Sequence, residues 1–256
     1  MQYVGAESIA ARGTCCNSGD PILVALRAPR FASAMTDPLG RRSAKHLARD
    51  APRAIEHPAD HARSLAEARH DAIECTACPL WKDATQTVFG EGEAHAPIML
   101  VGEQPGDSED RAGRPFIGPA GRFLDRALIE AGIDREKVYV TNAVKHFKYV
   151  PRGKRRMHKK PADAEIAACH QWLARELEFV APRLIVALGV TAARSLLGRA
   201  TPIENNRGRV LTFSNNARLL ITVHPSALLR IPDEFKREAY LRFVADLKIA
   251  ARFVNP

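Results

Sequence analysis

Ten consecutive residues decide the fold class: Ile98-Met-Leu-Val-Gly-Glu-Gln-Pro-Gly-Asp107. The first four are apolar without interruption, and the run ends in a glycine followed by charged and turn-forming residues. An unbroken apolar run of this kind is typical of a strand buried on both faces, as in a parallel sheet covered by helices. Three further runs share the pattern, over residues 138–142, 184–189 and 219–223.

Amphipathic stretches of helical length separate these runs. They cover residues 120–131, 162–180, 191–197 and 234–253. In the first stretch Leu124, Ala127 and Leu128 fall on one helical face, which is the spacing of a helix packed on a sheet. The alternation of buried strands with such helices predicts an α/β fold with a mostly parallel central sheet.

Residues 1–68 differ in composition from the rest of the chain. They mix proline with arginine, alanine, aspartate and histidine, and they sustain neither the helical nor the strand period. We therefore predict a mostly disordered leader over residues 1–68, followed by one domain over residues 69–256. A helix late in the leader is compatible with its sequence.

The chain of 256 residues is basic, with 38 Lys and Arg against 29 Asp and Glu and a net charge of +9. This charge favours polyanionic partners, of which nucleic acid comes first.

The longest apolar runs are too short to span a membrane, and the N-terminus lacks the pattern of a secretory signal, so we expect a cytoplasmic protein without a membrane partner. The five cysteines in such a chain indicate metal or cluster ligation rather than a disulfide framework.

Ligands of an open parallel sheet gather beyond the carboxyl ends of its strands. In this chain the rule selects four segments: residues 102–110, Asn142 with the basic loop after it, Gly189, and residues 224–230. We expect the functional site where these segments meet.

Four motifs carry a resemblance to a known family. They are Gly102-Glu-Gln-Pro-Gly-Asp-Ser-Glu-Asp110, Gly113-Arg-Pro-Phe-Ile-Gly-Pro-Ala-Gly-Arg122, Tyr139-Val-Thr-Asn-Ala-Val-Lys145 and His224-Pro-Ser-Ala-Leu-Leu-Arg230. In this order, over residues 70–254, the chain resembles the iron-sulfur branch of the uracil-DNA glycosylase superfamily. The resemblance implies a three-layer α/β/α sandwich around a mostly parallel four-stranded sheet, and an enzyme that removes uracil from DNA.

Two details are similar to the UdgX type, which excises uracil and then stays covalently attached to the abasic site. They are Glu103-Gln-Pro105 and the insertion Lys154-Arg-Arg-Met-His-Lys-Lys-Pro161. The resemblance implies that His158 bonds to C1′ of the sugar through a ring nitrogen, which requires a free lone pair. Eight Lys and Arg lie between residues 145 and 160 without an acid, and like charge disfavours protonation of the imidazole.

The resemblance also implies a set of residues that bind the flipped base. The amide of Asn142 would match the uracil O4 and N3–H, and Phe116 would stack on the ring. His224 would donate a hydrogen bond to O2 as negative charge develops on the leaving base. Gly102 belongs to the same set. Taken singly, these residues are also compatible with a turn Asn, a core Phe and a structural His.

Two carboxylates are expected to act on the sugar, and Gln104 is a further candidate catalytic residue beside them. Glu103 and Asp107 are the carboxylates that would stabilise an oxocarbenium-like cation at C1′. We hypothesise that Glu103 also holds the ring of His158 by its other nitrogen. Gln104 stands where turnover relatives tend to carry a small residue. Two roles are compatible with this position: contact with the base or backbone of the DNA, or part of a turn.

Four cations are expected to bind the DNA backbone. Lys154, Arg155 and Arg156 belong to the basic loop, and their contacts would fix the strand in register. Arg230 would insert beside the vacated stack or contact a phosphate.

The expected partners are uracil and uracil-containing DNA, preferably single-stranded, bound by a monomer. The alternatives are a turnover glycosylase in which His158 only binds DNA, and a zinc-bound nucleic-acid binding module without catalysis.

The cysteines form a second candidate site. Cys75 and Cys78 make a CxxC motif, Cys169 lies in the helix after the basic loop, and His146 stands where the iron-sulfur glycosylases usually have a cysteine. Spacing and hardness alone would suit zinc. The resemblance implies a [4Fe-4S] cluster with His146 as the fourth ligand and a structural role, since base excision needs no electron.

Overall fold

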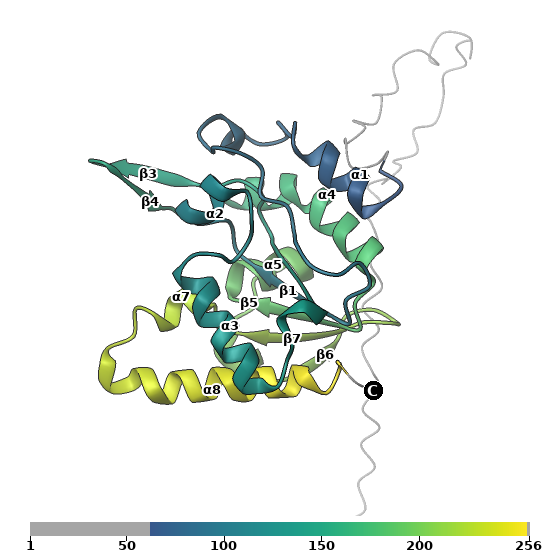
Figure 1. The fold of residues 1–256 in the computed structure, drawn as a ribbon, viewed down its shortest axis with the longest axis vertical. Helices are drawn as coiled ribbons and strands as arrows, with labels where there is room; N and C mark the ends of the chain where they lie inside the picture. The colour runs from purple at the N-terminus through teal and green to yellow at the C-terminus, as the bar shows by residue number, and fades with distance from the viewer. Residues whose placement is uncertain (1–61, 255–256) are drawn as a thin grey trace, which may run out of the picture. The chain divides into compact units, whose positions relative to one another are not determined.

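The computed structural model describes residues 62–254 (Figure 1). Most of the predicted leader therefore lies outside the described residues. Helix α1 (Leu65–Ala72) begins four residues before the predicted start of the domain. Within residues 62–254 no helix is both long and apolar enough to cross a bilayer.

The four predicted strands form a parallel sheet in the order β2-β1-β5-β7. Their bounds are β1 (Ile98–Gly102), β2 (Val138–Asn142), β5 (Leu184–Leu188) and β7 (Arg218–Thr222). Every residue of β1, β2 and β5 is buried, as continuous apolar runs predict. A short strand, β6 (Val210–Thr212), joins the edge of the sheet antiparallel to β7 and was not predicted.

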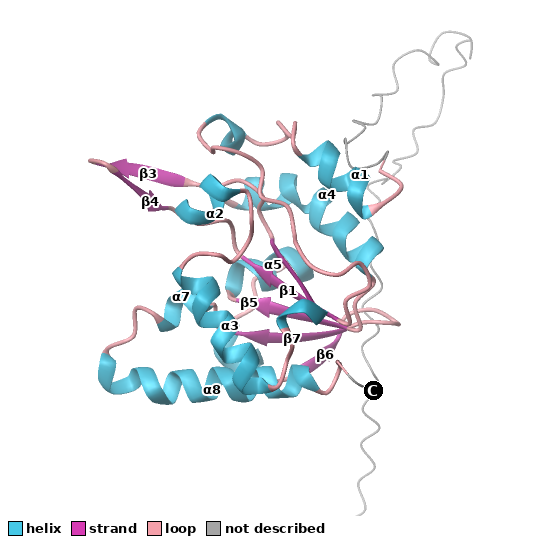
Figure 2. Ribbon diagram, viewed as in Figure 1, coloured by secondary structure: helices cyan, strands magenta, loops and turns pink. Residues whose placement is uncertain are grey.

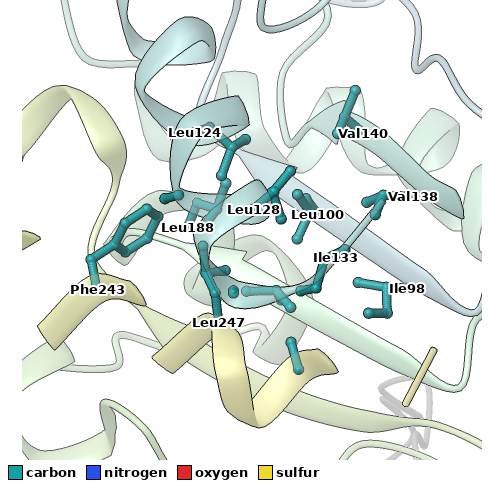
Figure 3. Packing of buried hydrophobic residues seen from close by; sticks show 14 of the residues in the cluster. Ile98, Leu100, Leu124, Leu128, Ile133, Val138, Val140, Leu188, Phe243 and Leu247 are labelled. Carbon is teal, nitrogen blue, oxygen red and sulfur yellow. The ribbon is translucent and has the colours of Figure 1, made fainter. Parts of the chain in front are cut away.

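The four predicted helices cover the two faces of this sheet, so the three-layer α/β fold is confirmed (Figure 1). They are α3 (Pro119–Ala131), α4 (Asp163–Val180), α5 (Val190–Leu197) and α8 (Asp233–Ala251). Leu128 of α3 and Leu247 of α8 pack with Leu100 of β1 on one face (Figure 3). Leu173 of α4 packs with Met99 of β1 on the other face.

The predicted basic loop is an antiparallel hairpin of β3 (Tyr149–Arg152) and β4 (Arg155–His158), which projects from the main sheet (Figure 2). Its turn contains Gly153, whose φ of 58° is in the left-handed region that favours glycine. The register places His158 opposite Tyr149. His158 is therefore carried by paired backbone rather than by an irregular loop.

Short elements make up the remaining regular structure. They are η2 (Pro79–Lys82), α2 (Asp107–Ala112), η3 (Arg135–Lys137), α6 (Ile203–Asn206) and α7 (Pro225–Leu228). Two of them start at motifs that the sequence analysis selected: α2 begins at Asp107, and His224 is the residue before α7. The carboxyl ends of the strands are thus bordered by helix starts, where backbone N–H groups are free for ligands.

Candidate active site

A cavity of about 430 Å³ lies at the carboxyl ends of the parallel strands. It is lined by Phe116 and by residues from each predicted strand-end segment except Gly189, among them Gln104, Asp107, Asn142, His158, His224 and Arg230. A second cavity of about 510 Å³ adjoins it, and Gln104, His158, His224 and Arg230 line both. Both volumes are in the range of small-molecule sites. The structure therefore brings the predicted base-binding and nucleophile residues together.

Gly102 allows two of these residues to converge. It is the last residue of β1 and pairs in register with Asn142, the last residue of β2. A Cβ atom at Gly102 would lie 2.3 Å from Oδ1 of Asn142 and 2.6 Å from Cζ of Phe116. Any larger residue would displace the amide and the ring, so the sequence requires glycine at this point.

Phe116 is held in an uncommon backbone conformation. Its φ of 57° is in the left-handed region, which is unfavourable for a bulky side chain. The side chain is buried and its ring stacks toward His224, with the ring centroids 6.1 Å apart. Strain of this kind persists where the surrounding structure fixes a functional geometry. It turns the ring toward the cavity, where a base can stack on it.

His224 is presented as a neutral hydrogen-bond donor. Its Nδ1 accepts from the backbone N–H of Ser226 at 3.1 Å, so the proton of the neutral ring is on Nε2. Burial lowers the pKa of His224 to about 4, and the neighbouring His158 and Arg230 act in the same direction. The ring is therefore neutral at pH 7, and Nε2–H is free to donate.

His158 is the last residue of β4, and its Nε2 lies 3.4 Å from Oε1 of Glu103. Burial lowers the pKa of His158; Glu103 opposes this effect, and Arg230 reinforces it. The expected direction is borne out, but its cause is different. Burial and Arg230 disfavour the proton, rather than the Lys and Arg residues of the hairpin.

Glu103 is held from the side opposite His158. Its Oε2 accepts a short hydrogen bond from Oγ1 of Thr191, in the first turn of α5. Sequence reasoning missed Thr191, although the strand-end rule selected Gly189, two residues earlier. The signal that would have found it is a hydroxyl in the helix start directly after β5.

Gln104 connects the two strands of the hairpin, β3 and β4, at the base of the hairpin. Its amide nitrogen donates to the carbonyl oxygens of Lys148 at 3.0 Å and Lys159 at 3.1 Å. Its amide oxygen accepts from the N–H of Lys148 at 3.2 Å. These partners belong to the protein's own main chain, so Gln104 fixes the position of the hairpin beside the cavity, and its contact with DNA stays a prediction.

Arg156 faces the protein rather than the solvent. Its guanidinium pairs with Asp107 and, at 2.6 Å, with Asp110, and it lies over the rings of Phe147 and Tyr149 at 5.3 and 5.1 Å. These contacts attach the hairpin to α2. A phosphate contact for Arg156, as predicted, would have to compete with two carboxylates.

Asp107 lines the base cavity, but its charge is balanced within the protein. The guanidinium of Arg111 lies 3.0 Å from one oxygen and that of Arg156 contacts the other. The hydrogen bond from Arg111, joined by that from Arg156, lowers the pKa of Asp107. The carboxylate is thus ionised at neutral pH, and two guanidinium groups partly balance its charge.

The other predicted DNA-binding cations are accessible. Lys154 and Arg155 are exposed at the tip of the hairpin, and Arg230 borders both cavities. Of these three cations, Arg230 lies beside the cavity, where a DNA backbone would have to pass for a base to enter.

The three cysteines of the second site are buried free thiols. The N–H of Lys145 points at Sγ of Cys169 at 3.2 Å, and the indole N–H of Trp172 points at Sγ of Cys75 at 3.1 Å. Burial raises the pKa of Cys78, and that of Cys169 to about 12. Two sulfurs thus have the N–H donors that stabilise thiolates, in a pocket where a thiolate needs a bound cation.

His146 offers the lone pair that a fourth ligand needs. The hydroxyl of Thr87 donates its one proton to the carbonyl oxygen of Ala72 at 2.8 Å, so the contact at 2.9 Å to Nε2 of His146 makes this nitrogen the donor. Nδ1 then carries the lone pair, and it is buried without a hydrogen-bond partner in the described residues. A metal-bound histidine typically has this arrangement.

The spacing of these residues does not decide between zinc and a cluster. Across residues 62–254 no three Cys, His, Asp or Glu side chains are grouped tightly enough to share one metal ion. This observation assigns neither zinc nor a cluster, and the [4Fe-4S] cluster stays a prediction.

Comparisons with known proteins agree with this geometry. The family model described as the Uracil DNA glycosylase superfamily matches residues 89–248, which is more than half of the chain. The chain belongs to the uracil-DNA glycosylase superfamily. It is 40% identical over 183 residues to the Type-4 uracil-DNA glycosylase of Thermotoga maritima, covering 71% of this chain and 90% of that protein.

Two further members of the superfamily are similar over most of their length. The chain is 36% identical over 198 residues to the Type-4 uracil-DNA glycosylase of Pyrobaculum aerophilum, covering 73% of this chain and 96% of that one. It is 34% identical over 178 residues to the Type-4 enzyme of Sulfurisphaera tokodaii, covering 66% and 78%. The predicted superfamily is confirmed, whereas the self-crosslinking type stays a prediction.

Proposed function

We propose that this chain excises uracil from DNA and that His158 then bonds to C1′ of the sugar, so that the protein stays attached to the abasic site. The first half is supported by membership of the uracil-DNA glycosylase superfamily and by the complete base cavity: the chain is a uracil-DNA glycosylase. The second half is supported by one observation: a neutral imidazole, backed by a carboxylate, at the border of that cavity.

Base recognition follows from the geometry of the cavity. A flipped uracil stacks on Phe116, and its O4 and N3–H edge meets the amide of Asn142. Nε2–H of His224 donates to O2. As the bond from N1 to C1′ breaks, its electron pair leaves with the base, and this hydrogen bond strengthens because the base becomes an anion. The sugar is left as an oxocarbenium-like cation.

Capture follows from the position of His158. A ring-nitrogen lone pair attacks C1′ of the cation and forms a carbon–nitrogen bond, which leaves the positive charge on the imidazole ring. The carboxylate of Glu103, 3.4 Å from the ring, balances that charge. No further proton transfer is needed for the bond to form. Because the excised base carries the negative charge away, the two halves of the reaction are balanced.

The rival activity is ordinary turnover, in which water attacks C1′ and His158 only binds DNA. It is favoured by the similarity to two proteins whose name, Type-4 uracil-DNA glycosylase, includes base removal but no attachment to DNA. Against it stands the attachment of the hairpin by Gln104 and Arg156, which fixes His158 at the cavity. A residue that only bound phosphate would need no such fixation.

We assign the cysteine site to a [4Fe-4S] cluster held by Cys75, Cys78, Cys169 and Nδ1 of His146. When bound, the cluster supplies structural cross-linking rather than electron transfer. Through Cys169 and His146 it would tie α4 to the segment after β2, next to Asn142. Single-stranded DNA is the favoured substrate, since it avoids the cost of unpairing the base. We expect the protein to act as a monomer in the cytoplasm.

A denaturing gel tests the capture. The purified protein is mixed with a single-stranded oligonucleotide that carries one deoxyuridine, and released uracil and shifted protein are measured in the same samples. The wild type should give one shifted protein molecule for each uracil released. His158→Ala should release uracil without a shifted band, whereas His70→Ala, an exposed histidine on α1, should behave as the wild type. A shifted band with His158→Ala would refute the assignment.

A further inference from the structure

Thr191 stands behind the carboxylate that faces His158. Gly189 ends the loop after β5, and α5 begins at Val190, so Thr191 lies in the first turn of the helix. Its side chain is buried, and its Oγ1 donates to Oε2 of Glu103. The other oxygen, Oε1, is the one that lies 3.4 Å from Nε2 of His158. The three side chains thus form a line from α5 to the hairpin.

This contact restricts the carboxylate in two ways. Glu103 follows β1 directly, and its long side chain would otherwise have several rotamers in a cavity of about 510 Å³. The hydrogen bond from Thr191 fixes one oxygen, so the other has to face the hairpin. The start of α5 also places free backbone N–H groups and the positive end of the helix dipole near the carboxylate.

We propose that Thr191 is a positioning residue, which holds Glu103 so that one carboxylate oxygen faces His158 while the new bond to C1′ forms. The inference rests on the proposed capture by His158 and adds a third residue to it. Thr191 touches neither the base nor the sugar in this arrangement. Its effect is therefore expected on the fate of the sugar cation rather than on binding of the base.

The test measures, for each variant, what fraction of the uracil excisions ends in attachment of the protein to DNA. For each variant, the quantity is the number of shifted protein molecules per uracil released from a single-stranded deoxyuridine oligonucleotide. A general loss of structure lowers both numbers together and leaves their ratio unchanged. Thr191→Val removes the hydroxyl at nearly constant volume and should lower the ratio about tenfold, as expected for a lost hydrogen bond to a charged group.

Three variants make the test specific. Thr191→Ser restores a hydroxyl and should restore the wild-type ratio. Ser195→Ala, one turn later on α5, removes a buried hydroxyl that has no hydrogen-bond partner in the described residues, and should leave the ratio unchanged. In a Glu103→Ala background Thr191→Val should have no further effect, because the carboxylate that it positions is gone.

The outcomes separate this inference from the capture itself. A wild type that releases uracil and never shifts overturns the capture and the role of Thr191 with it. A wild type that shifts, with an equal ratio for Thr191→Val, overturns the role of Thr191 alone. A ratio that Thr191→Ser fails to restore, or a full effect of Thr191→Val in the Glu103→Ala background, also overturns it.

Discussion

At the scale of single residues, the site depends on which histidine ring nitrogens remain free when the other ring nitrogen is hydrogen-bonded within the protein. His224 has its Nδ1 occupied by the N–H of Ser226, so its remaining nitrogen is a donor. His146 has its Nε2 occupied by Thr87, so its remaining nitrogen is an acceptor. Both histidines thus carry their proton on Nε2, but His224 keeps its N–H free for a partner whereas His146 keeps its lone pair free.

The first prediction concerns Gly102. In Gly102→Ala the new methyl group would meet Oδ1 of Asn142 and Cζ of Phe116, so uracil excision should fall at least about 100-fold, as expected for a misplaced reacting group. The matched control is Gly132→Ala, where the added atom meets nothing within 4 Å but φ is 76°. The control should lose about 1 kcal/mol of unfolding free energy and keep its activity. Equal activities of the two variants would contradict this account of Gly102.

The second prediction concerns pH. His224 must be neutral to accept from Ser226 and donate to uracil. Because burial lowers its pKa to about 4, the proton adds only in acid, and the active form persists far below the ordinary histidine range. The single-turnover rate of uracil release by His158→Ala should therefore be level from pH 8 to about pH 5.5 and fall below it. A midpoint near 6.5 would show that His224 titrates as an exposed histidine.

At the scale of elements, a buried ion pair connects the two sites. Nζ of Lys145 donates to Glu176 on α4, to the hydroxyl of Thr141 at 2.6 Å and to the carbonyl oxygen of Asn142 at 2.8 Å. Both charged side chains are fully buried. The same lysine donates its backbone N–H to Cys169. The end of β2, which carries Asn142, is therefore fixed to α4 and the cysteine site.

The third prediction concerns this pair. Lys145→Met leaves the charge of Glu176 buried and unpaired, so the free energy of unfolding in urea should fall by about 3–5 kcal/mol. Lys145→Met with Glu176→Gln removes both charges and keeps an oxygen for the remaining donors, so it should be more stable than the single variant. The control, Lys236→Met, breaks an exposed pair with Asp233 and should change stability by less than about 1 kcal/mol. A double variant less stable than Lys145→Met would contradict the explanation.

The fourth prediction concerns the attachment of the hairpin. Gln104→Ala removes the bridge between the ends of β3 and β4 and should reduce shifted protein per uracil released, because His158 loses its fixed position. Arg155→Ala, at the exposed tip of the hairpin, should weaken DNA binding, reduce the salt dependence by about one counterion and leave that ratio unchanged. If both variants had the same ratio as the wild type, the hairpin would not be positioned by Gln104.

The elements that could be predicted from the sequence are those whose signal lies within the element. Each main strand is a continuous apolar run, and each main helix has its own apolar face. Strand β6 has three residues and no fully buried one, so no period is visible in it. The hairpin is rich in cations, and its fixation depends on Asp107 and Asp110, 49 and 46 residues away from Arg156 along the chain. A partner so distant cannot be found from local pattern.

At the scale of the whole molecule, the described residues combine one sheet edge, one hairpin and one cysteine site. The strand-end rule is enough to locate the candidate cavity from the sequence, because parallel strands bring their carboxyl ends together whatever the loops contain. The rule does not separate residues that face the cavity from residues that hold the scaffold. Arg156 belongs to the second kind, and Gln104, which lines the cavity, also holds the hairpin; their hydrogen-bond partners show this.

The fifth prediction concerns the cluster. The purified protein should absorb light at about 400 nm, as expected for iron bound by thiolates. His146→Ala should lose part of this absorbance and unfold at a lower temperature than the wild type, because one ligand and one cross-link are lost. Thr87→Val should have a smaller effect in the same direction, since it removes only the partner of Nε2. A colourless wild type that contains zinc would contradict the assignment.

The central claim is that the imidazole of His158 reaches C1′ before water does. Peptide mapping by mass spectrometry, after reaction with a short deoxyuridine oligonucleotide and digestion of protein and DNA, tests it most directly. The account predicts a peptide around residue 158 that carries the sugar on the histidine ring, with free uracil in equal amount. Unmodified peptide beside released uracil, or a sugar attached to any other residue, would contradict it.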